Sequence, residues 1–338
     1  MTEWSQENEK KILRKYRFTL TFRVLRVLLI CFFIYALYII GVSIVFDKTR
    51  PDLKHAYNSL IVLEWLNPNM KGQYSMGSPA EITPFLTQKF SYPLEKQVGK
   101  EKVVVGEMHV EKSIMNSNSS LSMDLPSTNT SQQFNFNLPE DPVTGKATSS
   151  QLNNNIWKIL EELPEGTVAE MAFSISSFKE PIKLVKMLAP YDVRIVWMPL
   201  YTGEFKSFEP TASGRSSGTI TIYDRIGLSG GLTVSDDYSH ISEAQDLSSN
   251  FSSNVKDSQR WMVRNMEKLL KNEKKSYYEG FLGLHHLQER YDYIKKNGFQ
   301  AYGAVVTGPT KQLWMLQDLE GISNEMLGDV ELMNGYNW

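Results

Sequence analysis

VLLICFFIYALYIIGVSIVF, residues 27–46, is the stretch that decides how this chain is organised. It runs for 20 residues without a charged side chain. A helix of that length spans about 30 Å at a rise of ~1.5 Å per residue, which matches the hydrocarbon core of a bilayer. Because lipid offers no partner for backbone N–H and C=O groups, a single spanning segment must be helical. The sequence therefore predicts one transmembrane helix near the N-terminus.

The basic residues on either side of this run predict its orientation. Seven Lys and Arg residues precede it, and within a similar distance three follow it. Because cytoplasmic flanks carry the excess of Lys and Arg, we expect residues 1–26 inside the cell and the remainder outside. A cleaved signal peptide would have a shorter apolar core and a small-residue cleavage site, and a buried core helix would not be apolar on all faces.

The composition excludes some classes of protein. The formal net charge is −2, so nothing in the overall charge suggests a direct nucleic-acid partner. The single cysteine, Cys31, lies inside the apolar run, so the outer part has neither disulfides nor a cysteine-based metal site. Eukaryotic ectodomains of this size usually carry disulfides. These features favour a bacterial cell-envelope protein, and no cofactor is expected.

Residues 1–26 form the only expected cytoplasmic part. Apolar residues recur there at spacings near four with basic residues between them, which predicts a short amphipathic basic helix that runs into the membrane. Such a helix suits either an anchor on anionic lipid headgroups or a docking site for a cytoplasmic partner. The candidate contacts are Lys11, Arg14, Lys15, Arg17 and Arg23.

The outer part divides into two modules joined by a linker. Residues 47–112 are a membrane-proximal module in which five prolines argue against long helices, and residues 102–110 are a predicted strand. Residues 113–155 are rich in Ser, Asn, Thr and Gln, which is typical of a polar linker. Residues 156–338 are the second module.

The second module begins with a strand–helix–strand unit. Residues 167–176 alternate between the two faces of an extended segment, which predicts a half-buried strand. Proline opens a predicted helix over residues 181–188. A strand over residues 193–200 follows, and Pro199 favours a strand end or a sheet edge.

The same order of elements recurs near the C-terminus, as a strand over residues 299–306, a helix over 311–319 and a strand over 328–333. Two such units in one module predict an α+β fold, with a mixed or antiparallel sheet covered by helices. Between the units, the sequence predicts a hairpin and two amphipathic helices, at residues 219–225 with 231–234, at 255–270 and at 284–297.

Two segments match the Gly-x-Ser-x-Gly pattern of esterase nucleophiles, with Ser216 and Ser229 at their centres. A nucleophile elbow needs a strand before the serine and a helix after it, and neither segment has both. We therefore interpret both as hairpin turns. His285 and His286 are neighbours on a predicted helix and point ~100° apart, so they cannot share a metal ion as residues four apart can. An exported serine hydrolase is the least favoured class, and no metal site is expected.

Two further stretches are candidates for a ligand or anion pocket. One leads from a strand into a helix, where free N–H groups and a lysine can hold an anion, although a capped turn is the simpler interpretation. The other is the end of an aromatic strand. The candidate residues are Trp197, Tyr201, Thr202, Thr307, Gly308, Thr310 and Lys311.

Three stretches of the second module resemble the C-terminal domain of the sigma factor regulator family. They are LPEGTVAEMAFS at residues 163–174, VRIVWMPLYTG at 193–203 and YGAVVTGPTKQL at 302–313. KILR at residues 11–14 and the span that follows look like the N-terminal domain of that family. Together the resemblance covers most of the chain outside residues 113–155.

This resemblance implies a bacterial membrane protein related to the anti-sigma factors of extracytoplasmic-function sigma factors, which hold a sigma factor inside and carry a domain outside. It implies a non-enzymatic regulator that contacts membrane lipids and a sigma factor or a partner membrane anti-sigma protein. The outer domain would be coupled through the span to the short inner helix. The alternative is a cell-envelope ligand-binding module with no role in transcription.

Overall fold

The computed structural model describes residues 6–75, 77, 80–113, 118–125, 134–149, 154–216, 218–236, 238, 240–243, 247 and 252–332. The chain forms two compact units, and each has its own architecture. The first comprises Met1–Pro51 and Ile82–Thr87, and the second comprises Asp52–Glu81 and Gln88–Trp338.

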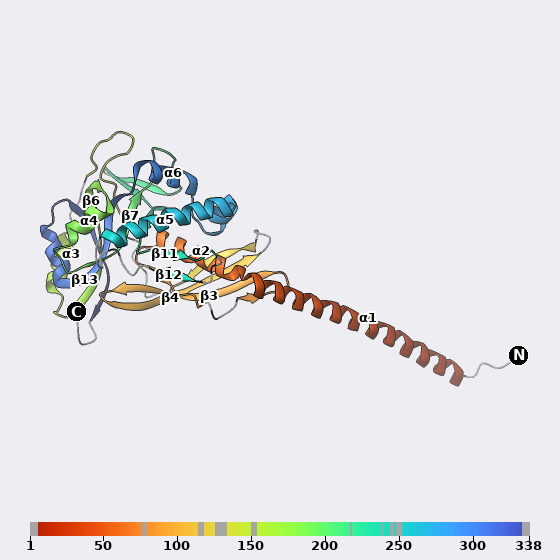
Figure 1. Ribbon diagram of the computed structural model, residues 1–338. Helices are drawn as coiled ribbons and strands as arrows, with labels where there is room; N and C mark the ends of the chain where they lie inside the picture. Colours follow the sequence, from red (N-terminus) through yellow and green to blue (C-terminus); the bar gives the residue numbers. More distant parts are fainter. Residues whose placement is uncertain are drawn as a thin grey trace. The chain divides into compact units, whose positions relative to one another are not determined.

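One long helix dominates the first unit. Helix α1, Gln6–Thr49, joins the expected basic helix and the expected transmembrane helix without interruption (Figure 1). Among the described residues it is the one helix long and apolar enough to cross a membrane, and no residue of its most apolar stretch is fully buried. It ends where Arg50 adopts a left-handed conformation, with φ of 40°, because a residue ahead of proline disfavours the α region. The prediction of a single N-terminal apolar helix is confirmed.

A five-stranded antiparallel sheet forms the centre of the second unit, with the strand order β10-β7-β13-β6-β14. Helix α4, Pro181–Leu188, connects β6 to β7. Helix α7, Thr310–Trp314, and the 3-10 turn η3, Met315–Asp318, connect β13 to β14. The strands are β6 Thr167–Lys179, β7 Arg194–Tyr201, β10 Ile226–Leu228, β13 Gln300–Pro309 and β14 Ile322–Leu332.

The four main strands of this sheet have βαββαβ connectivity. Strand β13 lies between the two strands that α4 joins, and β6 lies between the two that α7 joins. This is the ferredoxin-like arrangement of split βαβ units. Helices α3, Asn154–Glu162, and α5, Ser252–Asn272, join α7 and α4 in packing on the sheet. The predicted α+β fold with two strand–helix–strand units is confirmed.

A second sheet comes from the N-terminal part of this unit. Its strands follow the order β1-β3-β4-β5, and β2 also pairs with β3. They are β1 Lys71–Gly72, β2 Glu81–Ile82, β3 Thr87–Val98, β4 Glu101–Ser113 and β5 Ser120–Asp124. The long connection from β7 to β13 contains β8 Ser213–Ser216, β9 Thr219–Ile222, β11 Leu232–Val234, β12 Ile241–Glu243, the π-helix η2 Ser276–Phe281 and α6 Leu287–Asn297.

Helix α2, Pro51–Leu66, corrects the prediction that prolines exclude long helices from residues 47–112. Pro51 occupies the first turn, where its missing N–H removes no helical hydrogen bond. The next proline, Pro68, comes after the helix has ended. Every residue of α2 from Ala56 to Trp65 is buried, so this helix lies inside the second unit rather than on its surface.

Strand β6 is buried on both faces, although its alternation predicted a half-buried strand. On the polar face, Asn69 donates a hydrogen bond to Glu170 at 2.8 Å, and the backbone N–H of Asn137 donates to Ser174 Oγ at 2.9 Å. Both partners come from segments far away in the sequence. The local pattern of β6 therefore contained no sign that a second layer covers this face.

Pro199 also lies inside the sheet, with β10 on one side of β7 and β13 on the other, and not at a strand end or edge. The register between β7 and β13 is irregular between Ala301 and Val305, opposite this part of β7. The missing N–H of proline is tolerated where the ladder is already interrupted. The expected hairpin is also corrected, because β9 pairs with β8 and β11 pairs with β12.

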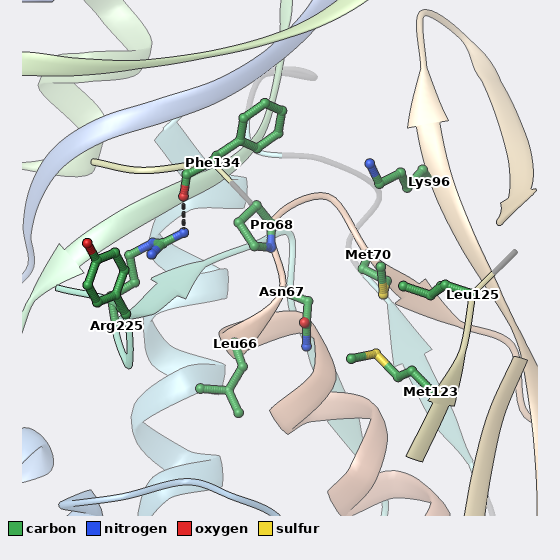
Figure 2. Close-up of a pocket in the computed structure, with 10 residues that line it drawn as sticks. Leu66, Asn67, Pro68, Met70, Lys96, Met123, Leu125, Phe134 and Arg225 are labelled. Carbon is green, nitrogen blue, oxygen red and sulfur yellow. Dashed lines mark hydrogen bonds between the residues drawn. The ribbon is translucent and has the colours of Figure 1, made fainter. Parts of the chain in front are cut away.

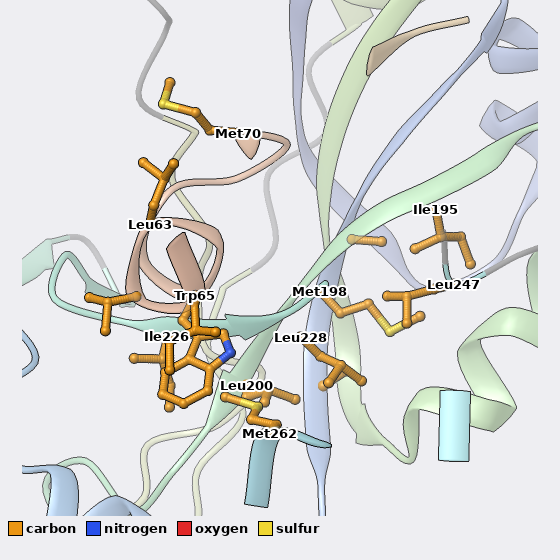
Figure 3. Packing of buried hydrophobic residues seen from close by; sticks show 14 of the residues in the cluster. Leu63, Trp65, Met70, Ile195, Met198, Leu200, Ile226, Leu228, Leu247 and Met262 are labelled. Carbon is orange, nitrogen blue, oxygen red and sulfur yellow. The ribbon is translucent and has the colours of Figure 1, made fainter. Parts of the chain in front are cut away.

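The main hydrophobic core of the second unit combines both parts of the sequence. Figure 3 shows Trp65 of α2 beside Ile226 in β10 and Met262 in α5, and Leu63 of α2 beside Met70; all belong to one buried cluster. Helix α2 thus completes the hydrophobic core beneath the five-stranded sheet. The boundaries at residues 47–112, 113–155 and 156–338 stay a prediction.

Candidate functional site

Helix α2 carries several polar groups although it is buried. Asp52, Asn58, Ser59 and Glu64 are each at most 5% exposed. Burying a polar group costs free energy unless it is hydrogen-bonded, so each of these groups requires a partner in the fold. The partners come from both sheets of the second unit and from the connection between β7 and β13, and they fix the position of α2 along its whole length.

On the side of the N-terminal sheet, two tyrosines hold the first half of α2. The hydroxyl of Tyr74 donates to Asp52 Oδ2 at 3.1 Å, and the hydroxyl of Tyr92 in β3 donates to Ser59 Oγ at 2.9 Å. Burial raises the pKa of Tyr92 above its ordinary value, which keeps this hydroxyl a proton donor.

On the side of the C-terminal sheet, Glu64 is the main contact of α2. Its backbone carbonyl accepts a hydrogen bond from Trp197 Nε1 at 3.0 Å, and its Oε2 accepts one from Ser229 Oγ at 2.8 Å. Burial raises the pKa of Glu64, and the positive charge of Lys71 and the Ser229 hydrogen bond oppose that rise. Ser229, which matched the esterase pattern, therefore supports α2.

The N-terminal part of α2 contains a histidine in a cationic environment. His55 Nδ1 lies 2.8 Å from the hydroxyl of Tyr277, which also accepts a hydrogen bond from Asn58 Nδ2 at 3.3 Å. Burial, reinforced by the charges of Lys54 and Lys112, lowers the pKa of His55 to about 3. The imidazole is therefore neutral at physiological pH, and Nδ1 can accept the Tyr277 proton.

A cavity of about 350 Å³ lies at the other end of α2 (Figure 2). Leu66, the last residue of the helix, lines it together with Asn67 and Met70 of the segment that follows. Its remaining wall is apolar except for Lys96, Tyr223 and Arg225; the apolar lining residues are Pro68, Met123, Leu125 and Phe134. A molecule in this cavity would touch the C-terminal end of the buried helix.

Arg225 is the unusual charge of this cavity. Its guanidinium donates to the carbonyl of Ile222 at 3.1 Å and to the carbonyl of Phe134, and it lies over the rings of Phe136 and Trp197. In the part of the chain that the structure describes, no carboxylate pairs with it and its Nε has no hydrogen-bond partner. Burial lowers the pKa of Arg225. A buried cation without a counter-ion favours an anionic ligand.

Lys96 of β3, by contrast, is paired. Its ammonium lies 3.3 Å from Glu170 of β6 and 3.0 Å from Asp329 of β14, so it joins the two sheets. Burial alone would lower the pKa of Lys96, but the two carboxylates raise it above its ordinary value. Glu170 is fully buried, and it needs this lysine and the hydrogen bond from Asn69 to be stable as a carboxylate.

The residues predicted for a ligand pocket are not brought together. In the β7–β13 ladder, Tyr201 pairs with Gln300 and Arg194 pairs with Thr307, so the two predicted stretches lie at opposite ends of the strands. Trp197 is fully buried and contacts α2.

At the end of the strands where Thr307 lies, the polar atoms of the predicted residues have structural roles or are buried. Thr307 Oγ1 accepts from the N–H of Gly99 at 2.7 Å and donates to the carbonyl of Ala169 at 2.9 Å. A side chain at Gly308 would collide with the backbone of Asp192. Lys311 donates to the carbonyl of Glu161 at 2.7 Å, and Thr310 is buried. Anion binding at Thr310 and Lys311 stays a prediction.

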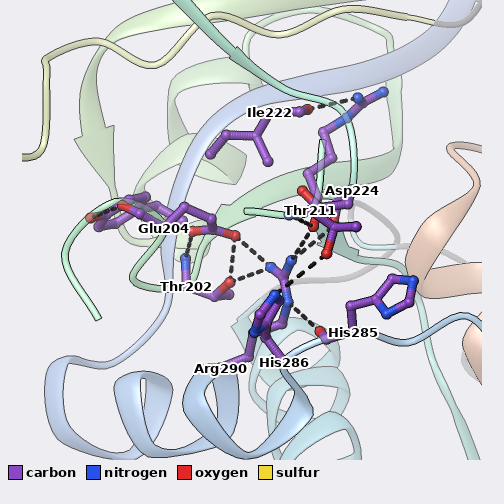
Figure 4. A network of polar contacts seen from close by, with 10 residues as sticks. Thr202, Glu204, Thr211, Ile222, Asp224, His285, His286 and Arg290 are labelled. Carbon is purple, nitrogen blue, oxygen red and sulfur yellow. Dashed lines mark hydrogen bonds and ion pairs between the residues drawn. The ribbon is translucent and has the colours of Figure 1, made fainter. Parts of the chain in front are cut away.

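Thr202 belongs to a buried polar network (Figure 4). Arg290 of α6 donates to Glu204 at 2.5 Å and to Thr202 Oγ1 at 2.6 Å, and all three side chains are at most 1% exposed. The network ties the loop after β7 to α6. His285 and His286 precede α6 instead of lying on a helix; the Arg290 side chain donates to the carbonyl of His285 at 3.0 Å.

The basic residues predicted to contact a partner or lipid all lie on α1 in the first unit. Lys11, Arg14, Lys15, Arg17 and Arg23 are exposed. Ile12, Tyr16 and Leu20 follow one another at intervals of one turn and are 56%, 68% and 51% exposed, so an apolar stripe runs between the basic residues.

Sequence reasoning missed the residues of the cavity, Lys96 and Arg225. Neither belongs to a motif, and their roles arise only when β3, β6 and the loop before β10 meet. Among the described residues, no group of three or more His, Cys, Asp or Glu is placed to hold a metal ion.

The fold and the apolar helix define a single-pass membrane protein with an α+β unit. Models of both halves of one family match the chain: sigma factor regulator N-terminal over residues 10–103 and sigma factor regulator C-terminal over residues 160–329. The second match alone spans half of the chain. The chain belongs to the sigma factor regulator family.

A curated relative has a function in its name. The probable anti-sigma-M factor YhdL of Bacillus subtilis (strain 168) is 26% identical over 253 residues, which cover 72% of this chain and 60% of the relative. The chain thus spans less than two thirds of that protein's length. No solved structure matches the chain.

Proposed function

We propose that this protein is a membrane-anchored, non-enzymatic regulator of sigma-factor activity. Its membership of the sigma factor regulator family and its similarity to a probable anti-sigma-M factor support this function. The observation that carries the mechanism is helix α2, which follows the membrane helix after a single left-handed residue, Arg50, and supplies part of the core of the second unit.

The signal passes along α2. Its C-terminal end lines the cavity that contains Arg225, and its first residue follows the last turn of α1 by one residue. A ligand that moves Leu66 or Asn67 therefore displaces a helix whose other end is covalently joined to the membrane span. Because the core is close-packed, α2 moves as a unit rather than by local compression.

The basic N-terminal segment of α1 faces the cytoplasm and carries the output. More Lys and Arg residues precede the apolar run than follow it, which favours this orientation. The exposed stripe of Ile12, Tyr16 and Leu20 offers an apolar contact to a partner helix, and the basic residues around it offer contacts to acidic side chains or lipid headgroups. The partner is a sigma factor or a membrane anti-sigma protein that holds one.

The test is sigma-dependent transcription in the native host. Deleting the gene should change expression from a sigma-dependent reporter, and the wild-type gene should restore it. A Lys11→Glu, Arg14→Glu, Arg17→Glu variant should fail to restore it. A matched variant with Lys158→Glu, Lys183→Glu and Lys186→Glu, all exposed in the second unit, should restore it fully.

Partner capture completes this test. A photo-crosslinking residue at Tyr16 should trap a sigma factor or an anti-sigma protein, and the same residue at the exposed Tyr223 should not. If deletion leaves the reporter unchanged and Tyr16 traps neither protein, the proposal is wrong. An envelope ligand-binding module without a role in transcription would then be the better description.

The cavity at the end of α2 takes an amphipathic acidic ligand in this proposal. Its wall is mostly apolar, and Arg225 offers a buried positive charge without a carboxylate partner among the described residues. On the full chain in nanodiscs, 2-naphthoate should raise the thermal unfolding midpoint more than the neutral 2-naphthalenemethanol. Arg225→Met should abolish the difference, and Arg215→Met, which changes a half-exposed arginine, should keep it. Equal effects of the two probes on the wild type would refute an anion site.

A further inference from the structure

The loop between β2 and β3 has an apolar sequence, Ile82-Thr-Pro-Phe-Leu86. Hydrogen bonds within the loop fix its shape: the N–H of Thr83 donates to the carbonyl of Thr87 at 2.9 Å, and the N–H of Leu86 donates to the carbonyl of Thr83 at 2.9 Å. Phe85 at its tip is 87% exposed, the highest value among the described large apolar side chains. A folded loop that presents a phenylalanine in this way marks an interaction surface.

This loop joins the paired strands β2 and β3, and it also packs with the membrane helix. Ile82–Thr87 and Met1–Pro51 form one compact unit. The hydroxyl of Tyr38 in α1 donates to the carbonyl of Pro84 at 2.9 Å. On the same part of α1, a stripe at helical spacing is half-buried while the rest is exposed; it consists of Ala36, Ile39, Val42 and Phe46.

The contact lies within the apolar run of α1. Tyr38 comes eight residues before Phe46, the last residue of that run, which corresponds to about 12 Å along a helix axis. A side chain on a helix leans towards the N-terminus, so the hydroxyl group lies no closer to the C-terminal end of the run than Tyr38 itself does. Where α1 crosses a bilayer, this depth is inside the hydrocarbon layer.

The chemistry of the loop fits that environment. Non-helical backbone enters hydrocarbon only where its polar groups have partners. Pro84 has no N–H, its carbonyl is paired with Tyr38, and the N–H groups of Thr83 and Leu86 are paired inside the loop. No residue from Ile82 to Leu86 carries a charge.

We propose that the loop Ile82–Thr87 inserts beside α1 into the membrane leaflet nearest to Asp47, with Phe85 among the acyl chains. The chain then contacts the membrane at two places: the spanning helix and this loop. Strand β3, which leads out of the loop, carries Lys96 of the cavity, so the second contact is connected through one strand to the ligand site. The proposal does not depend on sigma-factor regulation.

Depth-dependent fluorescence quenching tests the insertion. The full chain with Cys31→Ser and Phe85→Cys is labelled with an NBD maleimide in detergent and reconstituted into phosphatidylethanolamine–phosphatidylglycerol vesicles. The matched control has Val143→Cys, a 68% exposed apolar residue of the second unit. Lipids with a doxyl group on the acyl chain should quench the probe at position 85 at least threefold more than the probe at position 143. If Phe85→Cys lowers the unfolding midpoint, Pro84→Cys serves in its place.

A second readout uses the unlabelled protein in the same vesicles. Position 85 should react with a membrane-impermeant maleimide at least tenfold more slowly than position 143. Equal reaction rates would place the loop in water and overturn the proposal. Slow reaction without quenching by the doxyl lipids would also overturn it, because a protein surface and not lipid would then cover the loop.

Discussion

Acidification should destabilise the protein through His55. The folded protein holds the pKa of His55 at about 3, because the ring is buried beside Lys54 and Lys112, and its ordinary value is 6.5. Below pH 6.5 the His55 imidazole binds a proton in the unfolded chain, whereas in the folded protein it stays neutral until the pH approaches 3. This part of the stability is fully present above pH 6.5 and is lost as the pH falls towards 3.

The size of the effect follows from the same pKa difference. One pH unit is worth about 1.4 kcal/mol for a group that titrates only in the unfolded state. Between pH 8 and pH 5, the contribution of His55 to the free energy of unfolding should therefore fall by roughly 2 kcal/mol. The carboxylate of Asp52 favours the charged ring, but burial and the two lysines outweigh it.

The measurement compares the wild type with His55→Gln. Urea unfolding of the full chain in nanodiscs, followed by near-ultraviolet circular dichroism, gives the free energy of unfolding at pH 5, 6, 7 and 8. Burial raises the pKa of Glu64 and of Glu170, which works in the opposite direction, but both groups are present in both proteins. Their contributions cancel in the difference between wild type and variant.

The difference between the two proteins should shrink by roughly 2 kcal/mol from pH 8 to pH 5. His240→Gln, which removes an exposed histidine, controls for the loss of a histidine as such. A difference that stays constant over this range would show that His55 is charged or solvated in the folded protein.

Three further substitutions test the buried interactions, each by the free energy of unfolding. Arg290→Met should cost about 3–5 kcal/mol because it leaves Glu204 buried without a cation, and Lys183→Met at an exposed pair should cost less than ~1 kcal/mol; equal costs would contradict the network. Lys96→Met should cost about 3–5 kcal/mol, and adding Glu170→Gln should recover most of it; additive losses would show that the pair is not coupled. Gly227→Ala should cost about 1–3 kcal/mol, because a Cβ there would lie 2.1 Å from the Trp197 ring. Gly280→Ala should cost less, because a Cβ at position 280 meets nothing within 4 Å. Equal stabilities of the two variants would show that the strands separate easily.

The sequence predicted the elements that depend on local periodicity. The apolar run became α1, residues 181–188 became α4, and the two strand–helix–strand units became the central sheet. These features follow from composition and from spacings of two or about 3.6 residues, which a single sequence contains.

The features that escaped prediction depend on contacts between distant segments. Glu170 looked like the solvent side of a strand until Lys96 and Asn69 covered it. Arg225 lies in a cavity whose other walls come from α2, β3 and β5. Helix α2 was missed because five prolines were counted over the module, although none lies between Asp52 and Asn67. The positions of the prolines, and not their number, predict where a helix can form in this module.

The polar contacts of α2 also determine the distances by which this helix can slide along its axis. Asp52, Ser59 and Glu64 each accept a hydrogen bond from a side chain of another segment of the chain. A slide of ~1 Å along the axis would stretch all of these hydrogen bonds at once, and no new partners would be reached until about 5.4 Å, one full turn. Intermediate positions are therefore high in free energy. If a ligand binds the cavity as proposed, a protein built this way would respond in discrete steps with a threshold, and a graded output would have to come from the fraction of molecules in each state.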